Sequence, residues 1–134
     1  MVEDLVQWLS TQLDGDTSRA MEAAEELGPE WYYDDGFVLA RRKDDMVVTG
    51  SQDFLEAERG RFVADHDPAR VLREIDAKRQ LLALHRQLED AQEMLDFCAI
   101  CDATGKYPEY PCVTLRLLAL PYADRPGYRE EWRP

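Results

Sequence analysis

Apolar side chains recur every three to four positions at the start of the chain, which is the period of a helix that faces a core. Four large apolar residues keep this spacing in the first stretch: Leu5, Trp8, Leu9 and Leu13. A second apolar group continues it up to Leu27, and Gly28-Pro29 then ends the helical region. Because Gly15 separates the two groups, the sequence leaves open whether residues 3–27 form one kinked helix or two.

Residues 31–49 change to the short apolar runs that are typical of strands. Asp34-Asp35-Gly36 separates two runs of aromatic and aliphatic residues, and an Asp-Gly pair in that position is a strong hairpin signal. A second turn at Lys43-Asp44-Asp45 leads into Met46-Val47-Val48-Thr49. The pattern predicts a three-stranded antiparallel meander with one face covered by neighbouring helices.

The clearest helix start in the chain is Asp67-Pro68, because aspartate caps a helix well and proline suits its first position. The preceding residues 53–64 are also compatible with a helix, and the pattern after Asp67 continues to about Asp96. Two apolar stripes about 120° apart run along this predicted helix. One stripe comprises Val71, Ile75 and Leu82, and the other comprises Ala77, Leu81, Leu84, Leu88, Ala91 and Leu95. Such a helix packs on two sides, against its own chain or against a second copy in a homodimer.

The apolar pattern after Cys112 predicts a short helix that stops at Pro121. A tail rich in proline, aromatic and charged residues follows it. Because Tyr122, Tyr128 and Trp132 carry large apolar surfaces, we expect the tail to lie back on the domain. The expected fold is α+β and mostly helical, with a long helix, a small meander and a zinc-stapled C-terminal helix and tail. We expect one domain over 1–134, with four parts: helices 3–27, meander 31–49, helices 53–96, and the Cys-rich unit and tail 98–134.

Charge narrows the classes of function. The 134 residues include 28 acidic and 16 basic ones, a net charge of −12, and residues 1–67 alone hold 17 acids and 6 bases. An acidic surface repels phosphate backbones, so we expect no direct nucleic-acid binding. No apolar run reaches the roughly 18 residues of a membrane span. The acidic start, Met1-Val2-Glu3-Asp4, lacks the pattern of a signal peptide, so we expect a cytoplasmic protein with reduced cysteines.

All three cysteines lie close together in sequence, as Cys98-x2-Cys101-x10-Cys112. A Cys-x-x-Cys pair and a third thiolate supply three of the four ligands of a tetrahedral zinc site. The best candidate for the fourth ligand is His85. In a helix unbroken to Asp96, His85 would lie about 16 Å from the helix end, so it can join only if the helix stops early or the chain folds back. Asp102, His66 or water are the alternatives.

Other interpretations of the cysteines stay open. They could be bare reduced thiols, or a redox pair at Cys98 and Cys101, although the pair lacks the strand–helix setting of thioredoxin-like proteins. A catalytic zinc would keep an open position beside an acid or base, for which Asp102 and Glu109 are candidates. The chain has no His-Glu-x-x-His motif, no zinc-deaminase signature and no phosphate loop. These absences favour a non-enzymatic protein.

Three segments carry a resemblance to a known family: Asp67-Pro68-Ala69-Arg70-Val71-Leu72-Arg73-Glu74 with Ala77-Lys78-Arg79, the Cys98-x-x-Cys101 pair, and Pro111-Cys112 through Trp132. In them the chain resembles a family of small acidic actinobacterial and actinophage proteins of unknown function. The resemblance implies a Cys-rich C-terminal unit. The association with phages and prophages that it implies favours a regulatory or interaction role, by analogy alone.

Taken together, these observations predict a cytoplasmic interaction or regulatory protein with a structural zinc ion at Cys98, Cys101, Cys112 and His85. Its partner would be a protein, possibly a basic one, that meets the acidic N-terminal half, and we expect neither nucleic-acid nor membrane binding. Two alternatives stay open: a small zinc-dependent enzyme with an open metal position, and an acidic charge mimic that inhibits a nucleic-acid-binding protein.

Overall fold

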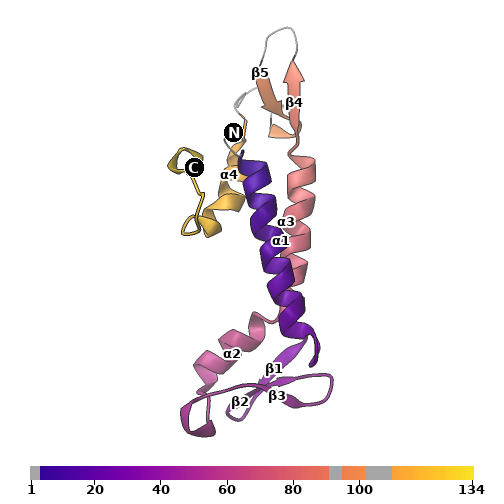
Figure 1. The fold of residues 1–134 in the computed structure, drawn as a ribbon, viewed down its shortest axis with the longest axis vertical. Helices are drawn as coiled ribbons and strands as arrows, with labels where there is room; N and C mark the ends of the chain where they lie inside the picture. The colour runs from indigo at the N-terminus through magenta and orange to yellow at the C-terminus, as the bar shows by residue number, and fades with distance from the viewer. Residues whose placement is uncertain (1–3, 91–94, 102–109) are drawn as a thin grey trace. The chain divides into compact units, whose positions relative to one another are not determined.

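The computed structural model describes residues 4–90, 95–101 and 110–134, and their contacts group the chain into two compact units. Unit one comprises residues 1–14 and 76–134, and unit two comprises residues 15–75. The boundaries fall inside α1 (Leu5–Ala24) and inside α3 (Pro68–Leu84), so each of these helices contributes to both units (Figure 1). The single domain over 1–134 therefore stays a prediction.

α1 is one helix that runs through Gly15, which answers the question left open for residues 3–27. Nothing lies within 4 Å of the position that a Cβ atom of Gly15 would take. The glycine therefore has no packing role. Leu13 and Ala20, on either side of it, are buried, and the helix continues between them.

Unit two contains the predicted meander: β1 (Trp31–Asp34), β2 (Phe37–Ala40) and β3 (Asp45–Thr49), in the order β1-β2-β3 with antiparallel pairs. Asp35 and Gly36 both have positive φ, 39° and 96°, as a tight two-residue hairpin turn requires. After the short 3-10 helix η1 (Ser51–Asp53), α2 (Ala57–Asp65) packs on β1 and β2. A Cβ atom at Gly60 would lie 2.1 Å from the ring of Tyr33, so glycine permits this close approach.

α3 begins as the sequence predicts. The carboxylate of Asp67 accepts a hydrogen bond from the backbone N–H of Arg70 at 2.9 Å, which caps the helix. Its second oxygen accepts from the N–H of Trp31 at 3.0 Å, which joins the helix start to β1.

The predicted end of α3 at Asp96 is wrong. The helix stops at Leu84, and the chain continues as β4 (Gln87–Asp90) and β5 (Leu95–Cys98), which pair as an antiparallel hairpin (Figure 1). The prediction of helix over 53–96 thus fails in its last part, because strand pairing overrides a local preference for helix.

Among the described residues, two-sided packing of this helix is also not observed. Of the first stripe, Ile75 is buried, but on the second stripe Ala77, Leu81 and Leu84 are exposed. Leu88 lies in β4, Leu95 in β5, and Ala91 lies outside the described residues. A homodimer through this face stays a prediction.

Unit one is built around the first turns of α1 and the C-terminal segment. Its core includes residues from α1, α4 (Val113–Ala119) and the 3-10 helices η3 (Leu120–Tyr122) and η4 (Glu130–Trp132). Within unit one, the buried residues of these elements are Leu5, Trp8, Leu9, Leu13, Leu115, Ala119, Tyr122 and Trp132.

The aromatic tail is docked, as the sequence predicts. The Trp8 ring lies 5.7 Å from that of Tyr128 and 5.4 Å from that of Trp132, measured between centroids. The indole N–H of Trp8 also donates to the backbone oxygen of Pro126 at 3.1 Å. The tail therefore supplies part of the core of unit one. Over the described part of the chain, no helix is long and apolar enough to cross a bilayer.

Candidate metal centre

Four side chains from three parts of unit one meet at the end of α3. His85 is the first residue after the helix, and its N–H still bonds to the backbone oxygen of Leu81 at 3.0 Å. The β4–β5 hairpin then folds the chain back, so that Cys98 lies opposite Gln87 in the strand register. The N–H of Ala99 donates a hydrogen bond to the backbone oxygen of Arg86 at 2.9 Å. The hairpin thus places Cys98 beside His85.

Cys101 follows Cys98 by one tight turn, in which its backbone N–H donates to the Cys98 sulfur at 3.4 Å. Cys112 comes from the other side of the site, where it is the residue that precedes α4. The backbone oxygen of Cys112 accepts from the N–H of Arg116 at 3.1 Å, which fixes the cysteine to the first turn of that helix.

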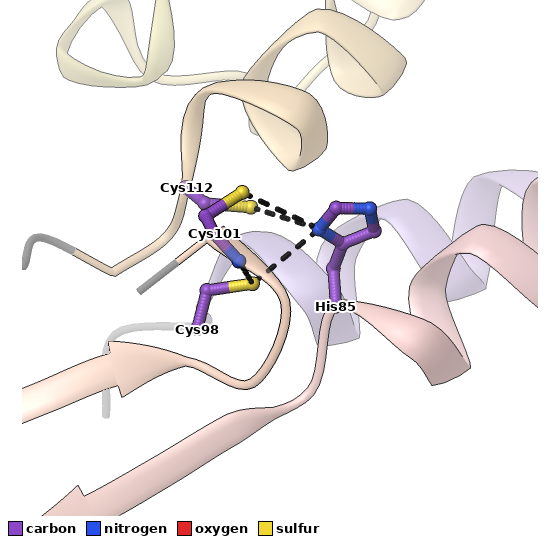
Figure 2. Close-up of side chains that lie close together, drawn as sticks. All are labelled: His85, Cys98, Cys101 and Cys112. Carbon is purple, nitrogen blue, oxygen red and sulfur yellow. Dashed lines mark hydrogen bonds between the residues drawn. The ribbon is translucent and has the colours of Figure 1, made fainter. Parts of the chain in front are cut away.

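The His85 Nδ1 atom lies close to all three sulfur atoms, at 3.4 Å from Cys98, 3.6 Å from Cys101 and 3.7 Å from Cys112 (Figure 2). The four donor atoms all lie within 4.8 Å of one another. In the described ranges, this is the one group of at least three His, Cys, Asp or Glu side chains placed to hold a metal ion.

The cluster is enclosed by protein. Cys98 is 0% exposed, Cys112 is 2% exposed and His85 is 8% exposed, while Cys101 is half-buried. All three cysteines are free thiols, without a disulfide. Buried thiols with an imidazole among them are the donors that soft and borderline metal ions prefer.

Two of the thiols differ in how readily they ionise. Burial opposes ionisation of Cys98, but hydrogen bonds from the backbone N–H groups of Cys101 and Ile100 outweigh it, so the pKa of Cys98 is lowered. Burial is the main cause that raises the pKa of Cys112 to about 11, and hydrogen bonds to Cys98 and Cys101 and the negative charge of Cys98 raise it further. Three thiolates packed together without a cation repel one another, so a metal ion would favour ionisation of the whole set.

Tyr110 lies on the margin of the same site. Burial, followed by the negative charge of Cys112 and of Cys98, raises the pKa of Tyr110 to about 12. The shift moves ionisation of the phenol further from neutral pH, where an ordinary tyrosine is already protonated. Sequence reasoning missed this residue, because a lone tyrosine before a proline gives no signal.

The alternatives for the fourth ligand fare differently. His66 lies in unit two, at the C-terminal end of α2, where its Nδ1 lies 2.7 Å from the Phe62 oxygen and its ring stacks on Phe62. It is the C-terminal capping residue of α2 and is no member of the cluster. Asp102 and Glu109 lie outside the described residues.

The objection to His85 as a ligand disappears with the early end of α3. The sequence offered two conditions, an early stop or a chain that folds back, and the structure meets both of them. The hairpin itself was missed, because nothing in residues 85–96 breaks a helix.

Comparison with known proteins identifies a family. No curated protein and no solved structure matches the chain. A family model does match, over residues 2–134, and it describes a family of unknown function. The resemblance in residues 67–134 agrees with this description, whereas the actinobacterial and phage association stays a prediction. Because the model covers nearly the whole length, the chain belongs to the family of unknown function DUF6221.

Proposed function

We propose that His85, Cys98, Cys101 and Cys112 hold one zinc ion with a structural role, in a non-enzymatic interaction or regulatory protein. The observation that carries the proposal is the set of four protein donor atoms, all within 4.8 Å of one another. A structural site is closed by four protein ligands, whereas a catalytic site keeps one position for water or substrate.

The spacing of the donor atoms fits a single ion. Around a tetrahedral zinc with Zn–S bonds of about 2.3 Å and a Zn–N bond of about 2.0 Å, sulfur and nitrogen lie about 3.6 Å apart. The three distances from Nδ1 to sulfur are 3.4, 3.6 and 3.7 Å. A multi-iron cluster needs a wider arrangement, because each cysteine then binds a different iron atom.

The role of such an ion is to join three segments that do not follow one another along the chain: the end of α3, the β5 turn and the start of α4. Structural zinc contributes about 10–16 kcal/mol of apparent binding free energy in small zinc peptides, and binding of that kind adds to folding. The other histidine, His66, is no member of this donor group. These points support a structural centre.

The partner in this proposal is a basic protein, and the site of action is the cytoplasm. The net charge of −12 supports the choice of partner, because opposite charge steers association. A short arginine-rich peptide is a direct probe. In an NMR titration, backbone amide signals of the protein that shift along a saturable curve as the peptide is added at low salt, and no longer shift at high salt, support a basic partner. An absence of shifts at low salt contradicts a basic partner.

Metal analysis tests the centre itself. The protein purified under reducing conditions should contain about one zinc per chain. His85→Asn should lose that zinc, whereas His66→Asn, the matched change at the other histidine, should keep it.

The absorption spectrum of the protein with Co²⁺ in place of zinc reports the identity and number of the ligands. Three thiolates and one imidazole predict a tetrahedral cobalt spectrum with strong sulfur-to-metal charge transfer. A five-coordinate spectrum that responds to added anions would show an open position and would instead support the zinc-dependent enzyme.

A further inference from the structure

A pocket of about 340 Å³ lies in unit two, between the second half of α1 and the start of α3. Ala20 and Ala23 line it from α1, and Pro68 and Val71 line it from α3. The alanines leave the space open because their side chains end at Cβ. Since the lining is predominantly apolar, water in the pocket makes few hydrogen bonds, and an apolar group displaces it favourably.

Trp31 forms a fixed wall of this pocket. Its indole N–H donates to the backbone oxygen of Gly28 at 3.1 Å, and its backbone N–H donates to the Asp67 carboxylate at 3.0 Å. The N–H of Ala69 donates to the backbone oxygen of Pro29 at 3.0 Å, which holds the start of α3 against the same loop. The pocket is therefore preformed, and binding does not have to order its walls.

The pocket opens to solvent beside an exposed aromatic ring. Ala23 and His66 both line the pocket, and both are exposed. The His66 ring stacks on that of Phe62 with 4.3 Å between centroids, and Phe62 is 65% exposed. Apolar surface that is both hollowed and exposed is typical of sites that bind another molecule.

The charge around the pocket is negative. Residues 16–30, which include its α1 wall, hold five acids and one base, and Glu22 and Glu26 are exposed. The base, Arg19, also lines the pocket, but it pairs with Asp16 at 3.8 Å and its side chain is 79% exposed. A segment bound here therefore meets an excess of carboxylates, which favours Lys and Arg beside its apolar residue.

We propose that this pocket receives one bulky apolar side chain of the basic partner protein, flanked in the partner by Lys or Arg. The inference rests on the proposed function, because it names the surface on which that partner docks. A volume of about 340 Å³ is near the lower limit of small-ligand sites, about 300–1,000 Å³, so the pocket suits one side chain and not a longer apolar segment. The apolar residue contributes affinity that salt does not screen, and the flanking bases steer association.

Two peptides with blocked ends test the proposal on the full-length protein as purified: Arg-Arg-Leu-Arg-Arg, and the same peptide with serine in place of leucine. The indole N–H signal of Trp31 reports binding in an NMR titration. The leucine peptide should bind about tenfold more tightly, a difference of about 1.4 kcal/mol, which burial of a leucine side chain can provide. High salt should weaken both peptides and leave the ratio of their affinities unchanged.

The outcomes separate this inference from the proposed partner. Equal affinity for the two peptides would overturn the pocket and leave the basic partner in place. If neither peptide shifts any signal at low salt, the basic partner is wrong and the pocket proposal fails with it. Acetyl-leucine amide that binds as tightly as the leucine peptide would show a site for free apolar molecules, which overturns the proposal. A Trp31 signal that shifts with protein concentration alone would assign the pocket to a second copy, which also overturns it.

Variants test the pocket directly. Ala23→Leu fills the space from an exposed helical position, so it should remove the advantage of the leucine peptide and leave the affinity of the serine peptide within about twofold. Ala83→Leu is the matched control, because Ala83 is an exposed alanine of α3 that belongs to unit one; the advantage should persist there. Arg19→Gln should tighten the binding of both peptides, since it removes a positive charge from the lining. An advantage that survives in Ala23→Leu, or is lost equally in Ala83→Leu, would contradict the proposal.

Discussion

At the residue scale, the cluster depends on which ring nitrogen of His85 faces the sulfur atoms. Nδ1 makes all three of the close approaches, so Nε2 points away from the cysteines (Figure 2). On the other side, the backbone N–H of Cys101 supports negative charge on the Cys98 sulfur. The Cys98 sulfur thus has a backbone hydrogen bond that supports it, as ligands of a preorganised metal site do.

Cys98→Ser should remove one ligand, because a serine hydroxyl does not ionise at neutral pH and binds zinc weakly. The metal content should fall well below one ion per chain. The free energy of unfolding should fall by about 3 kcal/mol or more, given the 10–16 kcal/mol associated with structural zinc. For a chain of this size, that corresponds to a melting temperature lower by roughly 10 °C in calorimetry. Wild-type protein stripped with a chelator should melt near the variant, and equal stability with and without metal would contradict the structural role.

The two helical glycines should respond in opposite ways to alanine. Gly60→Ala places a Cβ atom 2.1 Å from the Tyr33 ring, and overpacking of this kind costs about 1–3 kcal/mol. Gly15→Ala meets nothing within 4 Å, and alanine is better than glycine inside a helix by about 0.5–1 kcal/mol. Urea unfolding should therefore show Gly60→Ala below the wild type and Gly15→Ala above it. If both variants gain stability, the close contact between α2 and β1 is not as described.

At the element scale, the sequence predicts what local chemistry decides. The Asp-Gly turn at Asp35-Gly36 gives the first hairpin, and the Asp67-Pro68 cap gives the start of α3, because both signals act within a few residues. The four clustered donors could be predicted too, since cysteine spacing and a scarcity of histidines leave few choices.

The end of α3 could not be predicted in the same way. Residues 85–96 contain good helix formers, and helix propensity differs by no more than about 0.7 kcal/mol per residue among ordinary amino acids. Strand pairing between residues 87–90 and 95–98 outweighs such small preferences, and the metal that we propose would add far more. Contacts between residues distant in sequence determine where α3 ends, and a local sequence pattern gives no information about such contacts.

The docked tail gives a prediction at the same scale. Trp132→Ala removes a side chain that is 5% exposed and contacts Trp8, so it should cost about 3–5 kcal/mol of unfolding free energy. Leu117→Ala is the control, because Leu117 belongs to the adjacent α4 and is 52% exposed; its effect should stay within about 0.5 kcal/mol. Chemical unfolding followed by tryptophan fluorescence and circular dichroism measures both. Similar stabilities for the two variants would show that the tail contributes little to the core.

At the scale of the whole molecule, the charge is shared more evenly than the sequence suggests. The first 67 residues appear as the acidic half when counted along the chain, yet residues 1–14 belong with the C-terminal part and residues 68–75 with unit two. By sequence, unit two holds 15 acids and 8 bases, and unit one holds 13 acids and 8 bases. Both units are therefore negative, and the excess of acids is not confined to one of them.

This distribution predicts that the protein does not bind DNA or RNA tightly at physiological salt. Binding of a phosphate backbone requires several unpaired Lys or Arg side chains on one surface. In the C-terminal tail, Arg133 pairs with Glu130 at 2.9 Å and Arg129 pairs with Glu131 at 3.1 Å, so tail arginines face carboxylates of their own chain. A mobility-shift titration with mixed-sequence duplex and single strands should show no complex at micromolar protein. The double variant Glu130→Gln, Glu131→Gln removes the two carboxylates of these pairs and lowers the negative charge of the tail, so it should bind weakly at low salt, which checks that pairing and repulsion are the cause. Submicromolar, salt-sensitive binding by the wild type would make the C-terminal part a nucleic-acid module and would overturn the assignment of a basic partner.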